Sequence, residues 1–100
     1  MNCKAEFLEE TLGKEVLCAI IEDIFVYDKT KYFFLKLNYT IEDFNIFLAS
    51  IDFEYDEGYG SQHIEGTIFY KDNTWSERLE HDGSEWWSYK KFPEIPKELL

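Results

Sequence analysis

The amino-acid sequence predicts an α+β fold, in which one or two short helices pack on one face of a twisted antiparallel sheet of about five to six strands. Apolar residues make up 45% and aromatic residues 19% of the 100 residues, which is enough for a hydrophobic core. Two segments have helical spacing, and the last third alternates polar and apolar residues between short turns. We therefore expect a single domain over residues 1–100, without internal repeats or linkers.

A helix is predicted near the N-terminus, in the stretch KAEFLEETLGK at residues 4–14. Phe7 and Leu8 share a side of this helix with Leu12. Gly13 is typical of the residue that ends a helix, because glycine adopts the left-handed conformation at little cost.

A hairpin and a second helix are predicted next. Residues 15–27 are β-branched and apolar on both sides at their start, which is typical of an interior strand. Residues 31–39 are expected to return antiparallel to it. Thr40 then has the character of a helix N-cap, because Asp43 follows three residues later as a short version of the capping box. The helix is expected over about residues 41–50.

The second half of the chain predicts short strands separated by turns. These strands are expected at residues 51–56, 63–71, 74–81 and 85–92, with a glycine-bearing loop, EGYGSQ, after the first. Asp82-Gly83 is a strong signal for a two-residue hairpin turn, and Asp72-Asn73 is a weaker one. Pro93 ends the sheet, because proline lacks the N–H group that a sheet interior requires.

Two-residue turns fix the strand register and assign each aromatic residue to a face. The expected pairs are Tyr70 with Trp75, Ile68 with Glu77, Gly66 with Leu79, Leu79 with Trp86, and Arg78 with Trp87. The core face then carries Ile64, Ile68, Tyr70, Trp75, Leu79 and Trp86, with room for a large ring at Gly66, and the opposite face carries Thr67, Phe69, Arg78, Trp87 and Tyr89. We expect Trp87 to stack on Arg78. Trp87 is either covered by the N-terminal helix or the C-terminal tail, or exposed as an anchor for a partner.

The charge of the chain restricts its partners. The sequence has 21 acidic and 10 basic residues, a formal net charge of −11 at pH 7. This charge repels nucleic acid and anionic membranes and attracts basic surfaces, so we expect no direct binding to either of the first two. The acidic N-terminal stretch is unlike a signal peptide, and no apolar run approaches the length of a membrane span. Cys3 and Cys18 lack the spacing of a metal or disulfide site and are expected to be free thiols in a reducing cytoplasm.

The stretch DFEYD alternates acidic and aromatic residues. On a strand, Asp52, Glu54 and Asp56 would form a row of carboxylates about 6.7 Å apart, with the two aromatic residues pointing into the core. An edge strand that charge keeps soluble explains such a row about as well as a binding surface does. The surrounding sequence favours binding, because residues 37–70 contain seven acidic residues and no Lys or Arg. Such a field steers basic partners, and evenly spaced carboxylates imitate a row of phosphates.

No residue pattern predicts a metal site or a catalytic site. The stretch DFEYDEG departs from a calcium-binding loop, since its glycine is one position late and His63 stands where the loop needs glutamate. His63 and His81 are expected at the same end of a hairpin, but without the spacing of a zinc motif. Glu77 is expected on the core face, with no acid or nucleophile beside it. We therefore predict no cofactor, no metal and no enzymatic activity.

Small, strongly acidic and rich in aromatic residues, the whole chain resembles in character the phage-encoded inhibitors of host defence nucleases, namely anti-CRISPR and antirestriction DNA mimics. The string GTIFYKDNTWSERLEHDGSEWW is also similar to small phage and bacterial proteins of no known activity. The resemblance implies an inhibitor that binds a basic surface of a nucleic-acid-binding protein by mimicry. The residues expected to bind the partner are Asp52, Glu54, Asp56 and Glu57, flanked by Glu42 and Asp43, with Tyr59 and Trp87 as aromatic anchors.

Three alternatives stay open. Immunity proteins that neutralise toxin nucleases are similar in size and charge and resemble this chain equally well. An adaptor domain whose acidity serves only solvation would have no salt-sensitive partner. A small hydrolase or metal enzyme would use His63, His81 or Glu77.

Overall fold

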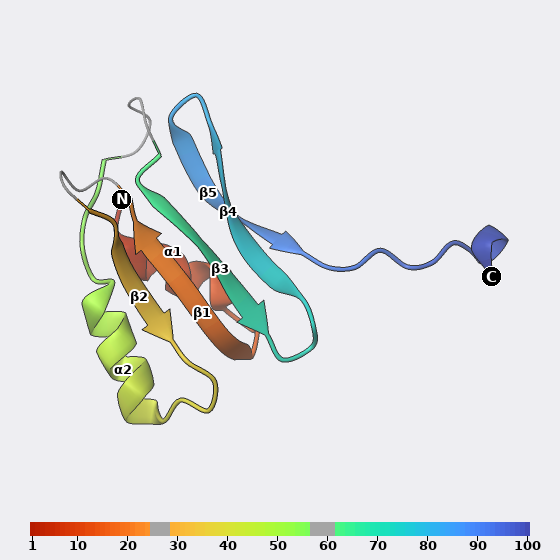
Figure 1. Cartoon of the computed structure of the whole chain (residues 1–100), viewed down its shortest axis with the longest axis horizontal. Helices are drawn as coiled ribbons and strands as arrows, with labels where there is room; N and C mark the ends of the chain where they lie inside the picture. Colours follow the sequence, from red (N-terminus) through yellow and green to blue (C-terminus); the bar gives the residue numbers. More distant parts are fainter. Residues whose placement is uncertain (25–28, 57–61) are drawn as a thin grey trace.

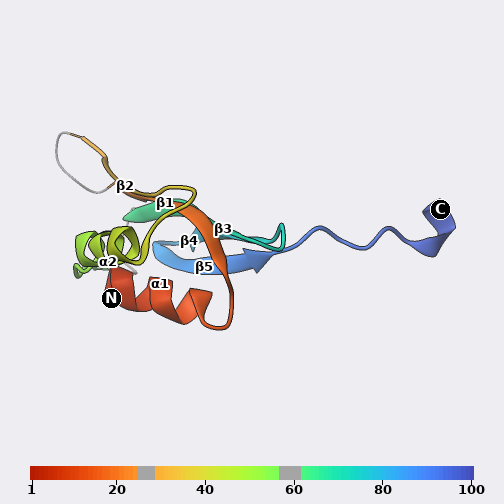
Figure 2. The ribbon, with the colours of Figure 1, turned by 90° about the horizontal axis from the view of Figure 1, so that it is seen from below.

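The computed structural model describes residues 1–24, 29–56 and 62–100, and in these residues the chain forms an open five-stranded antiparallel sheet with two helices. The elements are α1 (Cys3–Thr11), β1 (Val16–Asp23), β2 (Lys31–Leu35), α2 (Ile41–Ser50), β3 (Ile64–Tyr70), β4 (Trp75–His81), β5 (Ser84–Lys90) and a 3-10 turn, η1 (Lys97–Leu99). The strand order is β2-β1-β3-β4-β5 (Figure 1). Both helices lie on one side of the sheet (Figure 2), which confirms the predicted α+β class. Within the described ranges, no helix is long and apolar enough to cross a membrane.

Local signals define the helix ends, and the sequence predicted two of them, the stop at Gly13 and the capping box at Thr40, but not the cap at Asn2. The side chain of Asn2 caps α1 by accepting a hydrogen bond of 2.9 Å from the Ala5 N–H. Gly13 follows the helix with φ of +78°, the left-handed conformation of a C-terminal stop. At α2, Thr40 and Asp43 form a reciprocal capping box in which both hydrogen bonds are 3.0 Å long.

The core lies between the two helices and the sheet. Phe7 of α1 is fully buried and contacts Phe47 of α2 edge to face, with ring centroids 5.3 Å apart. Ile21 and Ile68 are fully buried on the sheet side. The sequence predicted that Leu8 and Leu12 share the side of Phe7, but both are exposed. The other buried residue of α1 is Cys3. Residues four apart on a helix share a face, so Cys3 and Phe7 point together towards the sheet.

The first two strands are shorter than predicted. β1 ends at Asp23, and residues 25–27 of the expected strand lie outside the described residues. β2 ends at Leu35 because the chain turns at Asn38, whose φ is +62°. The hydroxyl of Tyr39 then donates a hydrogen bond of 2.5 Å to the Val16 carbonyl.

The turn between β3 and β4 is longer than predicted, and this moves β4 by one residue. Tyr70 donates its N–H to the Thr74 carbonyl at 2.9 Å, and Asn73 has φ of +67°, so the loop spans residues 71–73. The observed pairs are Thr67 with Glu77, Ile68 with Ser76, and Phe69 with Trp75. A shift of one residue sends every side chain of a strand to the other face. β5 keeps its predicted register with β4, since Arg78 pairs with Trp87 and Leu79 with Trp86. The side chains of β5 therefore change face together with those of β4.

The sheet therefore has a covered face under the helices and an open face on the other side. The open face carries Cys18, Ile20, Glu22, Tyr32, Phe34, Glu65, Thr67, Phe69, Trp75, Glu77, Leu79, Trp86, Ser88 and Lys90. The prediction that Trp75, Leu79 and Trp86 belong to the core is wrong. Ser76, Arg78 and Trp87 occupy the covered face instead.

The C-terminal tail leaves the sheet after β5, as the prolines predict. It runs away from the sheet and the helices (Figure 1), and residues 91–100 are all exposed. Its first aromatic residue, Phe92, contacts Trp75 with ring centroids 5.2 Å apart.

Candidate partner-binding surface

The segment 52–56 is held by the N-terminus rather than by the sheet, so the prediction of a strand at 51–56 is wrong. Glu54 forms one isolated antiparallel bridge with Asn2. The Tyr55 N–H donates to the Met1 carbonyl at 2.8 Å, and the Met1 amino group donates to the Tyr55 carbonyl at 2.9 Å. These contacts satisfy the N–H and the carbonyl of Tyr55 without a neighbouring strand.

Side chains alternate along this acidic segment (residues 52–56) as predicted. Phe53 packs against Phe33 with centroids 5.7 Å apart, and Tyr55 is 9% exposed. Asp52, Glu54 and Asp56 are exposed. Asp52 is partly neutralised, since it accepts a hydrogen bond of 3.1 Å from the Asn2 amide and lies 3.9 Å from the Lys4 ammonium. The carboxylates of Glu54 and Asp56 form no ion pair within the described residues.

The other predicted binding residues are distributed over separate parts of the fold. Glu42 is exposed in the first turn of α2. Asp43 uses its carboxylate in the capping box, so its charge also stabilises the helix N-terminus. Glu57 and Tyr59 lie outside the described residues.

Trp87 does not serve as an exposed anchor, because it packs against the core on the covered face. The predicted stacking partner is correct, since the Arg78 guanidinium lies 5.4 Å from the centre of the Trp87 ring. A second ring, Tyr55, lies 5.8 Å from the same guanidinium. Arg78 donates hydrogen bonds to Glu85 at 2.9 Å, to Glu6 at 3.3 Å and to the Tyr55 hydroxyl. These four side chains, Arg78, Glu6, Glu85 and Tyr55, form the Arg78 cluster.

The Arg78 cluster is buried and fully hydrogen-bonded. The two oxygens of Glu85 also accept backbone N–H groups, from His63 at 2.7 Å and from Ile64 at 2.9 Å. Burial alone would lower the pKa of Arg78, but the Glu6 and Glu85 carboxylates raise its pKa above the usual value. Burial and a hydrogen bond to Glu6 raise the pKa of Tyr55. The cluster therefore connects α1 to β3, β4, β5 and the acidic segment.

A second polar contact holds the other end of α1. Ser76 donates to the Glu10 carboxylate at 2.6 Å, and its hydroxyl also lies 2.6 Å from that of Tyr70. Burial is the main reason that the pKa of Tyr70 rises to about 12. The Lys14 ammonium lies 4.8 Å from the centre of the Tyr89 ring. The side of α1 that meets the sheet therefore carries the polar side chains of Glu6 and Glu10 as well as the buried Cys3 and Phe7.

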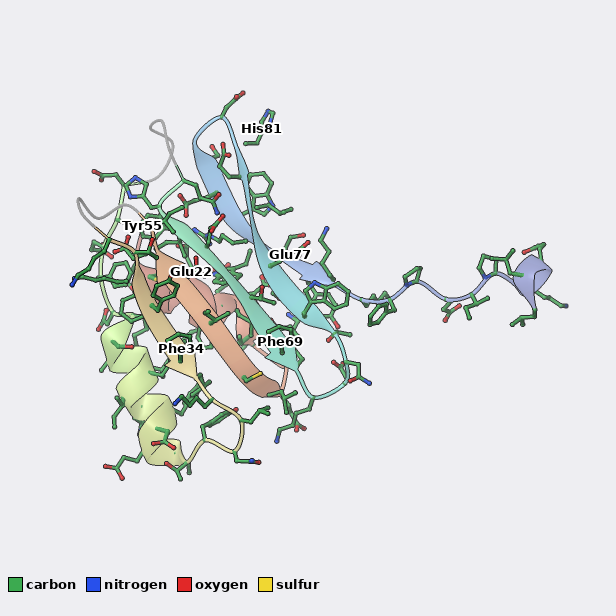
Figure 3. The ribbon with its side chains drawn as sticks, viewed as in Figure 1. Glu22, Phe34, Tyr55, Phe69, Glu77 and His81 are labelled. Carbon is green, nitrogen blue, oxygen red and sulfur yellow. The ribbon has the colours of Figure 1, made fainter. Side chains whose placement is uncertain are left out.

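The two histidines have different surroundings. His63 is buried and its ring contacts Tyr55, whereas His81 is exposed at the tip of the β4–β5 hairpin beside Asp82 (Figure 3). Across the described ranges, no three His, Cys, Asp or Glu side chains are placed to hold a metal ion. The prediction that Glu77 faces the core is wrong, because it lies on the open face between Thr67 and Ser88.

The open face is rich in exposed aromatic side chains, and this is the feature that the sequence did not reveal. Tyr32 is 55% exposed, Phe34 57%, Phe69 44% and Trp86 43%. The rings of Tyr32 and Phe34 are stacked, with centroids 6.0 Å apart. A shallow groove of about 430 Å³ runs beside them and is lined by Cys18, Ile20, Phe34, Lys36, Leu37 and Phe69. Exposed aromatic patches of this kind mark protein-binding surfaces.

Carboxylates are interspersed among these rings. Glu22 of β1 is paired directly with Glu65 of β3, and Tyr32 of β2 is the partner of Glu22 on its other side. Figure 3 shows Glu22 and Glu77 on the same side of the sheet as Phe34 and Phe69. The three open-face carboxylates have no ion pair in the described part of the chain. The face therefore combines apolar contact area with unpaired negative charge.

The open face and the acidic segment are separate surfaces. The acidic segment belongs to the covered side, since Phe53 contacts Phe33 and Tyr55 reaches Arg78. The one signal in the sequence for an exposed aromatic row is KYFFLK, in which Tyr32 and Phe34 alternate with residues that the core needs. Comparisons with family models, with curated proteins and with solved structures return no match for this chain, so the surface itself has to indicate the function.

Proposed function

We propose that this protein is a non-catalytic, acidic inhibitor that binds the basic surface of a nucleic-acid-binding protein and keeps nucleic acid from that surface. The observation that carries the proposal is the set of unpaired carboxylates on exposed surfaces: Glu22, Glu65 and Glu77 on the open face, and Glu54 and Asp56 on the acidic segment. With a net charge of −11, they create a field that attracts Lys and Arg and repels nucleic acid.

The buried polar groups support a binding role rather than a reaction. Arg78, Glu85 and Ser76 connect elements to one another through hydrogen bonds, and each is buried. A nucleophile with an adjacent base, open to a substrate, is the usual signature of catalysis. The open face presents exposed rings, the exposed carboxylate of Glu65 and the half-buried carboxylates of Glu22 and Glu77, which suit protein recognition.

The resemblance to phage-encoded inhibitors suggests the class of target, a nuclease complex of host defence in the cytoplasm. An immunity protein that neutralises a toxin nuclease would act through the same physical contacts, because toxin nucleases also present basic surfaces. Neither assignment requires a metal, a cofactor or a membrane. The identity of the captured target separates the two.

The proposal is tested by capture with the protein tagged at its exposed C-terminal tail. The tagged chain is incubated with lysate, washed at increasing salt concentrations, and the bound proteins are identified by mass spectrometry. We expect a nucleic-acid-binding protein that elutes as salt rises and that added duplex DNA or RNA displaces. Purified target should then lose nucleic-acid binding when this protein is added.

Two matched variants provide the control. One removes three charges from the open face (E22Q/E65Q/E77Q), and the other removes three from the acidic segment (D52N/E54Q/D56N). Because both lower the net charge equally, a larger loss of capture by one of them identifies the surface in use. Nucleic-acid mimicry would be refuted if no partner is captured, or if retention of the partner does not change with salt or added nucleic acid.

A further inference from the structure

We propose that the docking surface is the open face of the sheet, and that it recognises arginine side chains of the partner through the row Tyr32–Glu22–Glu65. This inference rests on the proposed function and specifies its contact surface and ligand chemistry. It moves the binding site from the acidic segment, where the sequence predicted it, to the other side of the sheet.

The first argument is the composition of the face. A sheet face that meets only water usually carries polar residues, and the covered face supplies the core of this protein without it. On the open face, four aromatic side chains are more than two-fifths exposed, namely Tyr32, Phe34, Phe69 and Trp86. Their exposure returns nothing to folding, whereas a partner that covers them would gain hydrophobic contact area.

The second argument is electrostatic. Glu22 and Glu65 are direct cross-strand partners, a position in which side chains lie about 4.5–5.5 Å apart and like charges destabilise the sheet. No cation neutralises them within the described residues. Among the lysines near this face, Lys36 lies beside Phe34, Lys90 is the cross-strand partner of Trp75, and Lys31 is the cross-strand partner of Asp23. A cationic partner complements this end of the face.

The third argument favours arginine over lysine. Within the same molecule, the Arg78 guanidinium is held by two carboxylates and two rings. The row Tyr32–Glu22–Glu65 offers two carboxylates and a ring on adjacent strands, and the ring of Phe34 is stacked beside that of Tyr32. A planar guanidinium can stack on a ring and donate two hydrogen bonds to a carboxylate, but an ammonium cannot do both.

The test uses an oligo-arginine peptide and an oligo-lysine peptide of equal length, titrated into the full chain at physiological ionic strength and followed by NMR and calorimetry. We expect the arginine peptide to bind about five-fold more tightly. Resonances of Tyr32, Phe34, Glu22 and Glu65 should shift. Equal affinity for the two peptides, or shifts confined to residues 52–56, would overturn the inference.

Two charge-matched variants isolate the site. E22Q/E65Q should weaken the arginine peptide about five- to ten-fold, whereas E54Q/D56N should weaken it less than about two-fold. Tyr32→Leu should reduce the preference for arginine over lysine while leaving lysine binding nearly unchanged. Equal losses in the two double variants would mean general charge attraction and would refute a defined site.

Failure of the inference differs from failure of the proposed function. If salt-sensitive capture of a nucleic-acid-binding protein survives E22Q/E65Q/E77Q but is lost in D52N/E54Q/D56N, the proposed function stands and the open-face site is refuted. If the arginine peptide binds as expected but captured partners are insensitive to salt and nucleic acid, the site stands and the mimicry is refuted. Thermal melting of each variant confirms that it is folded.

Discussion

At the scale of single residues, the guanidinium of Arg78 joins segments that are far apart in the sequence. It contacts Glu6 of α1, Tyr55 of the acidic segment and Glu85 of β5. The side chains of Arg78 and Glu85 are 1% and 0% exposed. Burying a charge is costly unless it is paired, so loss of this one cation leaves two mostly buried carboxylates uncompensated.

We expect Arg78→Met, which preserves much of the volume, to lower the free energy of unfolding by about 3–5 kcal/mol. The control is Lys71→Met, which breaks the exposed pair of Lys71 with Glu15 at 3.7 Å. Exposed pairs contribute little, so this change should cost about 0.5 kcal/mol or less. Urea denaturation of the two variants measures both values, and similar losses would mean that the Arg78 cluster is not the connection we describe.

At the scale of elements, β1 and β3 approach each other closely at Gly66. A Cβ added there would lie 2.3 Å from the Ile20 carbonyl oxygen, and Gly66 has φ of +154°. The sequence suggested that this glycine makes room for a large ring. The structure shows that it makes room for the backbone of the neighbouring strand.

Gly66→Ala should therefore destabilise the sheet by more than about 3 kcal/mol, because the backbone of β1 has to move. The matched control is Gly13→Ala, where φ is also positive but nothing lies within 4 Å of the added Cβ. That change should cost about 1 kcal/mol, the penalty of the left-handed conformation alone. Thermal and urea unfolding compare the two, and equal costs would rule out the close approach as the cause.

How far the elements can be predicted from sequence depends on which signal specifies them. The capping box of Thr40 and Asp43, the stop at Gly13 and the pairing of Arg78 with Trp87 follow from local residue types, and all three are confirmed. The register of β4 depends on whether the preceding loop has two or three residues. Asn73 can take a positive φ in either case, so the sequence did not decide between them.

The residues of α1 that face the sheet could not be predicted from the sequence, for a different reason. Leu8 and Leu12 were predicted to share the side of Phe7, yet the helix buries Phe7 and Cys3 and directs Glu6 and Glu10 towards β4. Polar residues are expected on the solvent side of a helix, and only the tertiary partners Arg78 and Ser76 make burial favourable here. Arg78 also packs against Trp87, and this contact on the covered face excludes Trp87 as an exposed binding residue.

At the scale of the whole molecule, the sequence predicted that the surface is negatively charged, but it did not predict where the candidate binding surface lies. Net charge and the alternation of residues 52–56 follow directly from composition and spacing, and the exposure of Asp52, Glu54 and Asp56 is confirmed. Thr67 and Phe69 were correctly predicted to lie opposite the core, but the aromatic open face as a whole was not predicted, because it depends on which side of the sheet the helices cover. Tyr32 and Phe34 look like core residues until that side is known.

The whole molecule should also lose stability at alkaline pH. Burial raises the pKa of Tyr70 to about 12 and that of Cys3 to about 12, and raises the pKa of Tyr55 further. In the unfolded chain tyrosine and cysteine ionise near their ordinary values of about 10 and 8.5. The unfolded state therefore releases protons first, and the free energy of unfolding falls as pH rises from about 9 to 12.

Urea denaturation at a series of pH values checks this expectation. The midpoint should be steady below about pH 9 and should then fall, with Tyr70 alone removing on the order of 2–3 kcal/mol by pH 12. Tyr70→Phe removes one of the titrating groups, so its decline should be shallower even if it starts lower. A midpoint that stays constant up to about pH 11.5 would contradict the burial of these groups.

Arg78 is the only arginine in the sequence, and its side chain is 1% exposed. A guanidine-selective reagent such as phenylglyoxal therefore has a single target in this chain, and the folded state shields that target. Because phenylglyoxal reacts slowly compared with reclosing, the rate of modification follows the population of the state in which α1, the acidic segment and β5 have separated, in the same way that amide exchange follows the opening of a hydrogen bond. Modification of Arg78 therefore reports the opening of the native protein without an engineered probe.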